Sequence, residues 1–325
     1  MKKILGIGNA LVDIIFFLEN DDLLKAFSLP KGSMQLVDAG KALRVEEAAN
    51  TYKKHMASGG SAANTIHGLA RLGVETAFVG TVGKDSFGEF FEKDMKDSGI
   101  SPQLSQGTTN TGRAISLVSP GGERTFATYL GAALELSANR LNAALFHGYH
   151  HLHLEGYLVH NQQLVESALV LAQQCSMTVS LDMASYNVVE ANLDFLKRII
   201  GQYKPVIFAN EEEARAFTGQ TDPHKSLDVF AMLCHTAVVK IGAKGSLIFH
   251  KGKKYTAGAI QVNCLDTTGA GDLYAAGYLY GFVNELAPDR CGKIGSLLAG
   301  KVIEEAGAKI GAASWDYIHK TLSTI

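Results

Sequence analysis

The chain has 325 residues, 46% of them hydrophobic, and its 30 Lys and Arg nearly balance its 32 Asp and Glu, giving a formal net charge of −2. That length is ample for a substantial core in one large domain or two smaller ones. The balance excludes a global field that would favour nucleic acid or an anionic membrane, and the chain holds no run of Lys or Arg. We therefore expect a small-molecule partner, and neither nucleic acid nor a membrane.

The cysteines and the first residues indicate a cytoplasmic protein. The four cysteines form no CxxC pair, as is typical of reduced thiols; they are Cys175, Cys234, Cys264 and Cys291. Lys2-Lys3 before the largely apolar stretch 4–18 imitates a secretory signal, but Asn9 and Asp13 interrupt that stretch and no small-residue cleavage site follows promptly. No stretch approaches the 18 uninterrupted apolar residues of a membrane span. We expect a first strand of a cytoplasmic enzyme here.

Apolar, β-rich runs alternate along the chain with longer amphipathic stretches. Strands are predicted at residues 4–8, 77–82, 151–154, 178–182, 206–209, 237–241 and 246–250. Helices are predicted at residues 62–72, 87–98, 161–175, 193–202 and 211–218. Such alternation predicts a mostly parallel sheet with helices on both faces. The expected fold is therefore a three-layer α/β/α domain.

Two segments, residues 14–38 and 111–130, interrupt this alternation. Both contain strand-like and turn-like patterns with no crossover helix, such as the alternation in residues 113–118 and the tight turn at Pro120-Gly121-Gly122. We interpret them as two pieces of a small β-sheet that forms a lid over the sheet edge where ligands bind. The predicted domains are then residues 1–13, 39–110 and 131–325 for the α/β domain, and residues 14–38 and 111–130 for the lid.

The segment Asp266-Thr267-Thr268-Gly269-Ala270-Gly271-Asp272 joins a strand-like run, residues 260–265, to a predicted helix at 273–282. Its glycines therefore sit at a helix N-terminus, where free N–H groups and the positive end of the helix dipole favour an anion such as phosphate. Asp272 places a carboxylate beside that anion, which suits deprotonation of a hydroxyl that attacks the γ-phosphate of ATP. The alternative is a plain turn in which Asp266 or Thr267 caps the helix.

Two common nucleotide-binding loops are missing from the sequence. The chain contains no GxxxxGK[ST], and Gly6-Ile7-Gly8 is not a full GxGxxG because Leu11 stands where the third glycine belongs. The glycine turn before Asp272 therefore belongs to neither class.

Six motifs follow one another along nearly the whole chain. They are Gly8-Asn9-Ala10-Leu11-Val12-Asp13, Ser58-Gly59-Gly60-Ser61-Ala62-Ala63-Asn64, Gly122-Glu123-Arg124, Asn210-Glu211-Glu212-Glu213, Lys240-Ile241-Gly242-Ala243-Lys244-Gly245 and residues 266–272. In this order they resemble the ribokinase-like (PfkB) family of sugar and nucleoside kinases. The resemblance implies a ribokinase-like fold with a β-lid and an ATP-dependent kinase that uses Mg²⁺.

By this resemblance, Asp272 is the general base, and the N–H groups of Gly269, Ala270 and Gly271 form the anion hole for the γ-phosphate. Arg124 follows a tight turn, from which its guanidinium could swing onto the transferring phosphate. The alternative for Arg124 is an exposed, solvated arginine on a hairpin.

The same resemblance assigns residues to the acceptor. Asp13 would hold two hydroxyls of a ribose-like ring, because a carboxylate accepts both bonds strongly. Gly59 and Gly60 would let the backbone approach the substrate, and Asn64 would add a hydrogen bond. The alternatives are a solvated or turn-capping Asp13 and a helix that merely begins with a serine cap. The remaining predicted substrate contacts are Asn9, Leu11, Met34, Leu36 and Leu130.

Asn210 and Glu213 resemble the NxxE motif of the family, which positions hydrated Mg²⁺ near the phosphates. The alternative is the acidic first turn of a helix, which the helix dipole stabilises. Gly242 and Gly245 match the nucleotide loop of the family, although Lys240 stands where ribokinases commonly carry Thr.

Further nucleotide and cation contacts are implied by the resemblance alone. Thr268, Ser296 and Ala299 are expected beside the nucleotide. The backbone around Asp266 and Thr268 holds a monovalent cation such as K⁺ in some relatives, and both outcomes stay open for this chain.

A histidine cluster offers a competing site. His147, His150, His151 and His153 lie close together in the sequence, and the last two would share a strand face. Because no acidic or cysteine pattern accompanies them, we interpret them as ordinary strand and loop histidines rather than metal ligands.

The acceptor is the least determined part of the prediction. Residues 8–13, 31–38 and 128–132 look more like the adenosine-kinase branch than ribokinase. The predicted leucine and methionine contacts would offer an apolar surface to a purine, whereas a free sugar would need more hydrogen-bonding partners. We expect a nucleoside such as adenosine. A sugar or sugar-phosphate kinase and a catalytically silent nucleotide-binding regulator are the alternatives, and monomer and homodimer both stay open.

Overall fold

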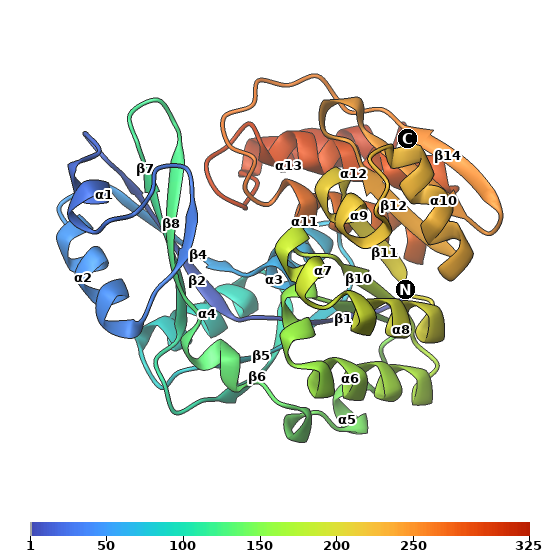
Figure 1. Cartoon of the computed structure of the whole chain (residues 1–325), viewed down its shortest axis with the longest axis horizontal. Coiled ribbons are helices and arrows are strands. Elements are labelled where there is room, and N and C mark those ends of the chain that lie inside the picture. The colour runs from blue at the N-terminus through green and yellow to red at the C-terminus, as the bar shows by residue number, and fades with distance from the viewer. Residues whose placement is uncertain (1) are drawn as a thin grey trace.

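The computed structural model describes residues 2–325, and they form a large α/β domain with a smaller sheet beside it (Figure 1). In spatial order the strands of the large sheet are β14 (Lys253–Ala257), β13 (Ser246–His250), β12 (Thr236–Lys240), β11 (Val206–Asn210), β10 (Thr178–Asp182), β9 (His151–Leu154), β1 (Ile4–Ile7), β5 (Thr76–Val82) and β6 (Ile100–Gln106). Neighbours from β12 to β6 run parallel, and only β13 and β14 are antiparallel. The predicted mostly parallel sheet is confirmed.

Successive residues of the buried strands pack into two cores, one on each face of this sheet. Ile4 contributes to one core and Leu5 to the other, as the alternation of side chains along a strand requires. One face is covered by α3 (Ser61–Arg71), α4 (Ser86–Asp97), α11 (Ala270–Val283), α12 (Pro288–Val302) and α13 (Ala312–Leu322). The other is covered by α5 (Ala143–Phe146), α6 (Gln162–Gln174), α7 (Tyr186–Ala191), α8 (Leu193–Tyr203), α9 (Glu211–Thr218) and α10 (Pro223–Leu233). These layers confirm the α/β/α architecture, and no helix within residues 2–325 combines the length and apolarity needed to cross a membrane.

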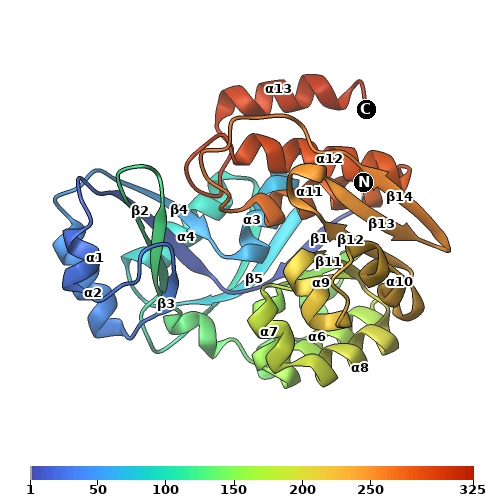
Figure 2. The ribbon, with the colours of Figure 1, turned by 45° about the horizontal axis from the view of Figure 1, so that its top comes forward.

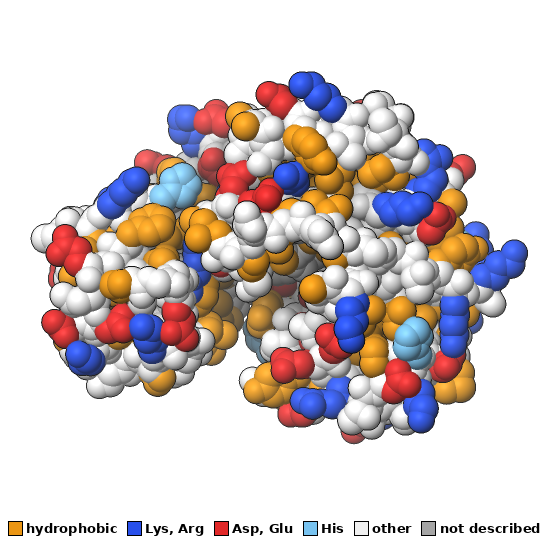
Figure 3. All heavy atoms as spheres, turned by 90° about the horizontal axis from the view of Figure 1, so that it is seen from above, with side chains coloured by type: hydrophobic (Ala, Val, Ile, Leu, Met, Phe, Trp, Pro, Cys, Tyr) orange, Lys and Arg blue, Asp and Glu red, His pale blue; other side chains and the backbone are white. Residues whose placement is uncertain are grey.

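The small sheet stands to one side of the large domain in both ribbon views (Figure 2). Its strands are, in order, β3 (Met34–Leu36), β8 (Arg124–Tyr129), β7 (Gly112–Val118), β2 (Leu11–Phe17) and β4 (Lys54–Gly59). Val12, Ile14 and Phe16 pack on the side of α1 (Asp22–Ala26) and α2 (Ala39–Ala49). The intervening residues, which include Asp13, face the large domain, and Figure 3 shows a hollow between the two lobes.

The strand pairing of the small sheet extends beyond the segments expected to form the lid. β2 begins at Leu11, and β4 pairs with it antiparallel so that Leu11 lies opposite Gly59. The expected division had left residues 11–13 and 39–110 in the α/β domain. No hairpin turn joins β2 to β4, so the sequence carries no local signal for this pairing. Where the domains divide stays a prediction.

Residues 260–265 do not form the predicted strand. Ile260 packs closely on Gly300 of α12, and the N–H of Leu265 donates to the carbonyl of Ile303 at 2.7 Å. Ile260 and Val262 are thus half-buried against a helix instead of in a sheet, whereas Leu265 is 59% exposed. The prediction was wrong because apolar periodicity reports which side chains are buried and not what the backbone bonds to.

Candidate active site

Asp272 lies in the first turn of α11, where two side chains of α3 hold its carboxylate. Its Oδ1 accepts from Ser61 Oγ at 2.7 Å and its Oδ2 accepts from Asn64 Nδ2 at 3.0 Å. Burial raises the pKa of Asp272 to about 6, and the nearby Asp182 carboxylate adds to this, whereas the Asn64 and Ser61 donors and the Lys240 ammonium oppose it. The carboxyl is therefore oriented and poised to exchange a proton near neutral pH.

A close approach of α3 and α11 brings these groups together. A Cβ added to Gly68 would lie 2.7 Å from the Cβ of Ala276, so only glycine permits this helix spacing. The hydroxyl of Thr65 also donates to the backbone carbonyl of Asp272 at 3.1 Å. Gly60 is the residue directly before α3, and none of the described side chains caps this helix. The alternative of a serine cap is thus wrong, and Ser61 instead binds Asp272.

The turn before α11 retains the form expected of an anion site. Gly269 has φ of 76° and precedes the first helical residue, and none of the described side chains caps the helix. The alternative in which Asp266 or Thr267 caps α11 is therefore wrong. The first N–H groups of a helix lack intrahelical partners and attract anions. Their contact with a phosphate stays a prediction for Gly269, Ala270 and Gly271.

Arg124 and Asp266 form an ion pair of 2.9 Å between the small sheet and this turn. Asp266 Oδ1 also accepts from the N–H and the hydroxyl of Thr268, and its Oδ2 accepts from the N–H of Gly307. The Arg124 side chain is only 8% exposed. The alternative of a solvated hairpin arginine is therefore wrong, and its guanidinium lies at the turn before α11.

Lys240, at the end of β12, also reaches this turn. Its ammonium pairs with Asp182 at 3.2 Å and would lie 3.0 Å from a Cβ added to Gly271. Burial lowers the pKa of Lys240, but the Asp182 and Glu213 carboxylates outweigh burial and the net shift is upward. A full positive charge therefore stands beside the predicted anion hole. Lys240 lies near Gly271, at one end of residues 266–272, and Arg124 pairs with Asp266 at the other end.

The two glycines after Lys240 are required by the turn between β12 and β13. Gly242 has φ of 56° and Gly245 has φ of 96°, and a Cβ on Gly245 would lie 2.0 Å from the carbonyl oxygen of Ala257. α12 packs beside this turn, since a Cβ on Gly292 would meet Ala257. These packing constraints do not test whether the turn contacts a nucleotide. The nucleotide contacts of Thr268, Ser296 and Ala299 also stay predictions.

Asn210 and Glu213 cap α9 reciprocally. Asn210 Oδ1 accepts from the N–H of Glu213 at 2.8 Å, and the two Glu213 oxygens accept from the N–H and Nδ2 of Asn210. This capping box agrees with the alternative in which the motif is the start of a helix. It accounts for the positions of both side chains without a metal. Burial raises the pKa of Glu213 to about 7, opposed by the Lys240 charge.

The acceptor side begins at the junction of β1 and β2. A Cβ on Gly59 would lie 2.1 Å from Asp13 Oδ1. Gly60 has φ of 100°, and a Cβ on it would lie 2.1 Å from the carbonyl oxygen of Asn9. The two glycines therefore let Asp13 and Asn9 approach the start of α3. These residues and Asn64 are brought to one place, as the sequence predicted for neighbours of one substrate.

Glu155, which directly follows β9, is a site residue that the sequence reasoning missed. Its Oε2 accepts from the N–H groups of Asn9 and Ala62, and its Oε1 accepts from Asn9 Nδ2. Burial raises its pKa to about 7 despite these donors. An acidic residue at the end of a predicted buried strand was the available signal, since strand ends line ligand sites in parallel sheets.

The predicted apolar contacts divide into two groups. Leu11 is buried against Gly112, and the carbonyl of Leu130 would lie 2.5 Å from a Cβ on that glycine, so these two meet at the base of the small sheet. Met34 and Leu36 lie on the edge strand β3 and are 51% and 65% exposed. The register aligns Leu36 with Thr128, Ala114 and Asp13 across the small sheet. Because cross-strand partners share a face, Met34 and Leu36 lie on the same face as Leu11, the face turned to the large domain, with β8 and β7 between them.

A model of the PfkB family of carbohydrate kinases matches residues 34–315. The chain belongs to the PfkB family. It is therefore a kinase with a ribokinase-like α/β fold, and PfkB kinases use ATP with Mg²⁺.

Known relatives of this PfkB kinase fall into two substrate groups. It is similar to an adenosine kinase from Sinorhizobium meliloti, with 30% identity, a TM-score of 0.87 and coverage of 98% of this chain and 99% of that one. A probable sugar kinase from Rhizobium etli is also 30% identical, with a TM-score of 0.89 and 98% of each chain covered. A nucleoside kinase from Methanocaldococcus jannaschii is 26% identical over 99% of this chain and 97% of its own length. These similarities agree on the family but are divided between sugar and nucleoside acceptors.

Of the clustered histidines of this PfkB kinase, His151 and His153 belong to the core, whereas His147 and His150 are exposed. His151 bonds Thr178 and Ser180 through its two ring nitrogens, and His153 bonds Ser180. Burial lowers their pKa values to about 3 and about 4, so both rings are neutral. Within residues 2–325 no group of three or more His, Cys, Asp or Glu side chains could hold a metal.

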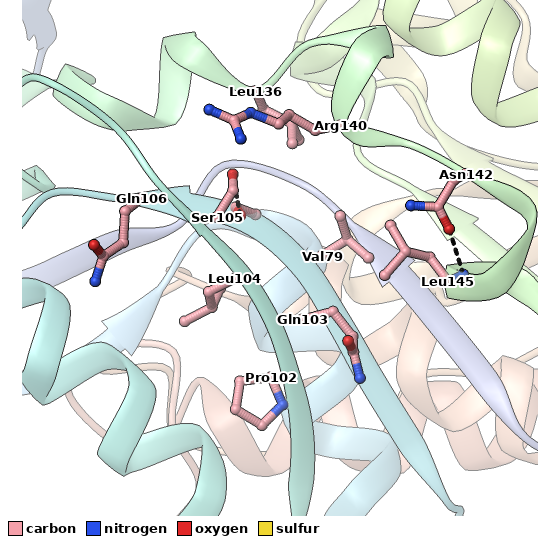
Figure 4. A pocket seen from close by; sticks show the side chains of 11 residues that line it. Val79, Pro102, Gln103, Leu104, Ser105, Gln106, Leu136, Arg140, Asn142 and Leu145 are labelled. Carbon is pink, nitrogen blue, oxygen red and sulfur yellow. Dashed lines mark hydrogen bonds between the residues drawn. The ribbon is translucent and has the colours of Figure 1, made fainter.

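A separate hollow of about 410 Å³ lies beside the edge strand β6 (Figure 4). Pro102, Gln103 and Leu104 line one side, and Arg140 and Asn142 lie across from them. None of the predicted site residues lines this hollow. The chemistry described above is therefore elsewhere, at the junction of the two sheets.

Proposed function

We propose that this PfkB kinase moves the γ-phosphate of ATP to a hydroxymethyl group of a ribose-containing small molecule, and that the acceptor is a nucleoside such as adenosine. One observation carries the proposal. The carboxylate of Asp272 stands at the uncapped N-terminus of α11 while Ser61 and Asn64 fix both of its oxygens. A base and an anion site so close together suit phosphoryl transfer better than binding alone.

In the proposed reaction the acceptor hydroxyl gives its proton to Asp272 as its oxygen attacks the γ-phosphorus. A bond forms between that oxygen and phosphorus, and the bond to the ADP oxygen breaks. The N–H groups of Gly269, Ala270 and Gly271 would stabilise the charge on the phosphoryl oxygens. Lys240 and Arg124 supply positive charge on either side of the turn.

The residues present fit a magnesium ion that is bound mainly by phosphate oxygens and water. Glu213 is the candidate protein ligand, together with Asn210, and both keep free lone pairs beyond the capping box. The described residues offer no cluster that would hold a metal by itself, which agrees with the few protein ligands of nucleotide-bound Mg²⁺. When bound, the ion would neutralise phosphate charge.

A monovalent cation at Asp266 and Thr268 is a finer part of the proposal. The Asp266 carboxylate already has a cation in the Arg124 guanidinium. Backbone carbonyls would therefore have to supply the ligands. A higher rate of ADP release with K⁺ than with a bulky organic cation at the same concentration would support this part, and equal rates with both would remove it.

For the acceptor, Asp13 would bind two ribose hydroxyls, and Asn64 and the Asn9–Glu155 pair lie beside it. Asn9 Oδ1 is buried without a partner in the described chain, so it could take a further hydroxyl. The exposed Met34 and Leu36 would cover a base, supported by the similarity to an adenosine kinase over nearly the whole chain.

A sugar or sugar-phosphate acceptor is the second candidate. The observation in its favour is that Met34 and Leu36 are exposed on β3, with β8 and β7 between them and Leu11 of β2. The likeness to a probable sugar kinase also supports it. An ADP-release assay with adenosine, inosine, guanosine, ribose, fructose and fructose 6-phosphate decides between the two.

The same assay tests the proposal as a whole. A nucleoside turned over with the highest kcat/KM would support it, and a sugar with the highest value would replace the acceptor. ATP binding without ADP release for every acceptor would favour a catalytically silent regulator instead.

A further inference from the structure

The loop between α12 and α13 is clamped between the phosphate turn and the small sheet. A Cβ on Gly269 would lie 2.6 Å from the Cβ of Ala308, and the N–H of Gly307 donates to Asp266 at 2.6 Å. On its other side, a Cβ on Gly307 would lie 2.9 Å from Ile15 Cδ1 of β2. The next residue, Lys309, is therefore fixed at the junction of the two lobes.

The Lys309 ammonium is buried there and has no hydrogen-bond partner among residues 2–325. The charges of three carboxylates from three elements act on it: Asp94 of α4, Asp13 of β2 and Asp272 of α11. Burial lowers the pKa of Lys309 to about 8, and these carboxylates oppose that shift. A buried cation that no single carboxylate neutralises is costly, so a structural role alone does not account for it.

Asp13 is the matching anion. Burial raises its pKa to about 7; the Lys309 charge lowers it, Asp272 raises it and Arg124 lowers it. Its carboxylate rests on Gly59, where a side chain would collide with it. An acceptor-binding carboxylate that became protonated would lose one of its acceptor oxygens.

The other positive groups nearby are less able to serve Asp13. Arg124 is committed to Asp266 in an ion pair of 2.9 Å. Burial lowers the pKa of His67 on α3 to about 2, so its ring is neutral. Arg71, farther along α3, lies over the ring of Trp315 at 5.6 Å. Among residues 2–325, Lys309 is thus the uncommitted cation whose charge acts on Asp13.

We propose that Lys309 is a positioning residue whose ammonium keeps Asp13 anionic, and so able to bind acceptor hydroxyls, when the two lobes bury that carboxylate. This inference rests on the proposed function, because it takes Asp13 as the acceptor-binding group. Lys309 itself need touch neither the acceptor nor the phosphate, since it acts on Asp13 through its charge.

The test is a direct titration of Asp13 in protein labelled with ¹³C at the aspartate carboxyl carbons. Comparison with Asp13→Asn assigns the signal. Lys309→Met should raise the Asp13 midpoint by about one pH unit or more, the usual effect of removing a nearby opposite charge. Lys309→Arg should leave it close to wild type, and so should the control Lys293→Met, a change at an exposed position of α12. Lys309→Gln replaces Lys309→Met if the latter does not fold.

An unchanged Asp13 midpoint in the neutral variant overturns the inference. A second readout is the pH dependence of acceptor kcat/KM, whose acid limb should move upward by the same amount and recover at higher pH. A loss of kcat/KM that is equal at every pH would mean that Lys309 contacts substrate or only shapes the fold, which also overturns it. If no acceptor yields ADP, the proposed function fails, while the NMR titration still decides the role of Lys309.

Discussion

The guanidinium of Arg124 and the carboxylate of Asp266 form a buried ion pair, with side chains 8% and 5% exposed and a separation of 2.9 Å. Arg124 begins β8 of the small sheet, and Asp266 lies in the segment before α11. The pair therefore joins the small sheet to the turn that the proposal assigns to phosphate. Any motion that opens the hollow between the lobes must break this pair or carry Asp266 with it.

Arg124→Ala should lower the free energy of unfolding by about 3–5 kcal/mol, because it leaves the Asp266 charge buried without its counter-ion. Urea unfolding measures this, and kcat should fall as well. The matched control is Arg198→Ala, which breaks an exposed pair with Glu166 and should cost at most about 1 kcal/mol. Equal effects of the two changes would contradict a coupling role for the Arg124 pair.

Asp272→Asn should lower kcat by about 10²-fold or more with ATP affinity nearly unchanged, because it removes the base but leaves the backbone of the turn. Single-turnover assays and ATP titration measure the two effects. Asp289→Asn, in the first turn of α12, makes the same chemical change away from the site and should be neutral. Near-normal turnover of the Asp272 variant would defeat the assignment of the base.

The acid limb of the kcat profile, measured with saturating acceptor, should report Asp272. Since its pKa is raised to about 6, mainly by burial, the basic form dominates above that pH and kcat should fall about tenfold per unit below it. Ser61→Ala removes a donor that lowers this pKa. The limb should therefore move to higher pH. The exposed Ser101→Ala is the control, and a limb that stays in place in Ser61→Ala would exclude Asp272 as the titrating base.

Gly271→Ala should weaken ATP binding without harming the fold. The new Cβ would press on the Lys240 ammonium, which lies 3.0 Å away at the end of a flexible chain and can move. Loss of one charge-assisted contact predicts a rise in KM for ATP on the order of tenfold. Gly201→Ala on α8, where the added Cβ meets nothing within 4 Å, should raise stability by about 0.5–1 kcal/mol and leave KM alone. An unchanged KM in Gly271→Ala would place Lys240 outside the nucleotide site.

Much of the fold followed from local patterns in the sequence. Apolar runs such as Val206–Asn210 and the amphipathic stretch of Leu193–Tyr203 form the predicted strand and helix. Residues 266–272 begin a helix with a glycine turn, as their composition predicted. These features depend on neighbours along the chain, so periodicity and turn chemistry are enough to predict them.

Periodicity did not reveal backbone pairing between distant segments. β2 and β4 pair although α1, β3 and α2 lie between them in the chain, and residues 260–265 pack on α12 instead of joining a sheet. Strand partners are chosen by the whole packed structure, and the sequence carries no mark of that choice where no hairpin turn is present.

For the site, the sequence by itself determined a glycine turn with a carboxylate behind it, because Gly269, Gly271 and Asp272 take their places at one helix start. Only the tertiary structure decided what surrounds that carboxylate. Ser61 reaches Asp272 across 211 residues, and Glu155 reaches Ala62 across 93. Such contacts, and the burial that raises the pKa of Asp272, exist only when α3, α11 and the small sheet pack together. The free energies of ionisation and of charge pairing depend on that packing, so no motif along the chain can supply them.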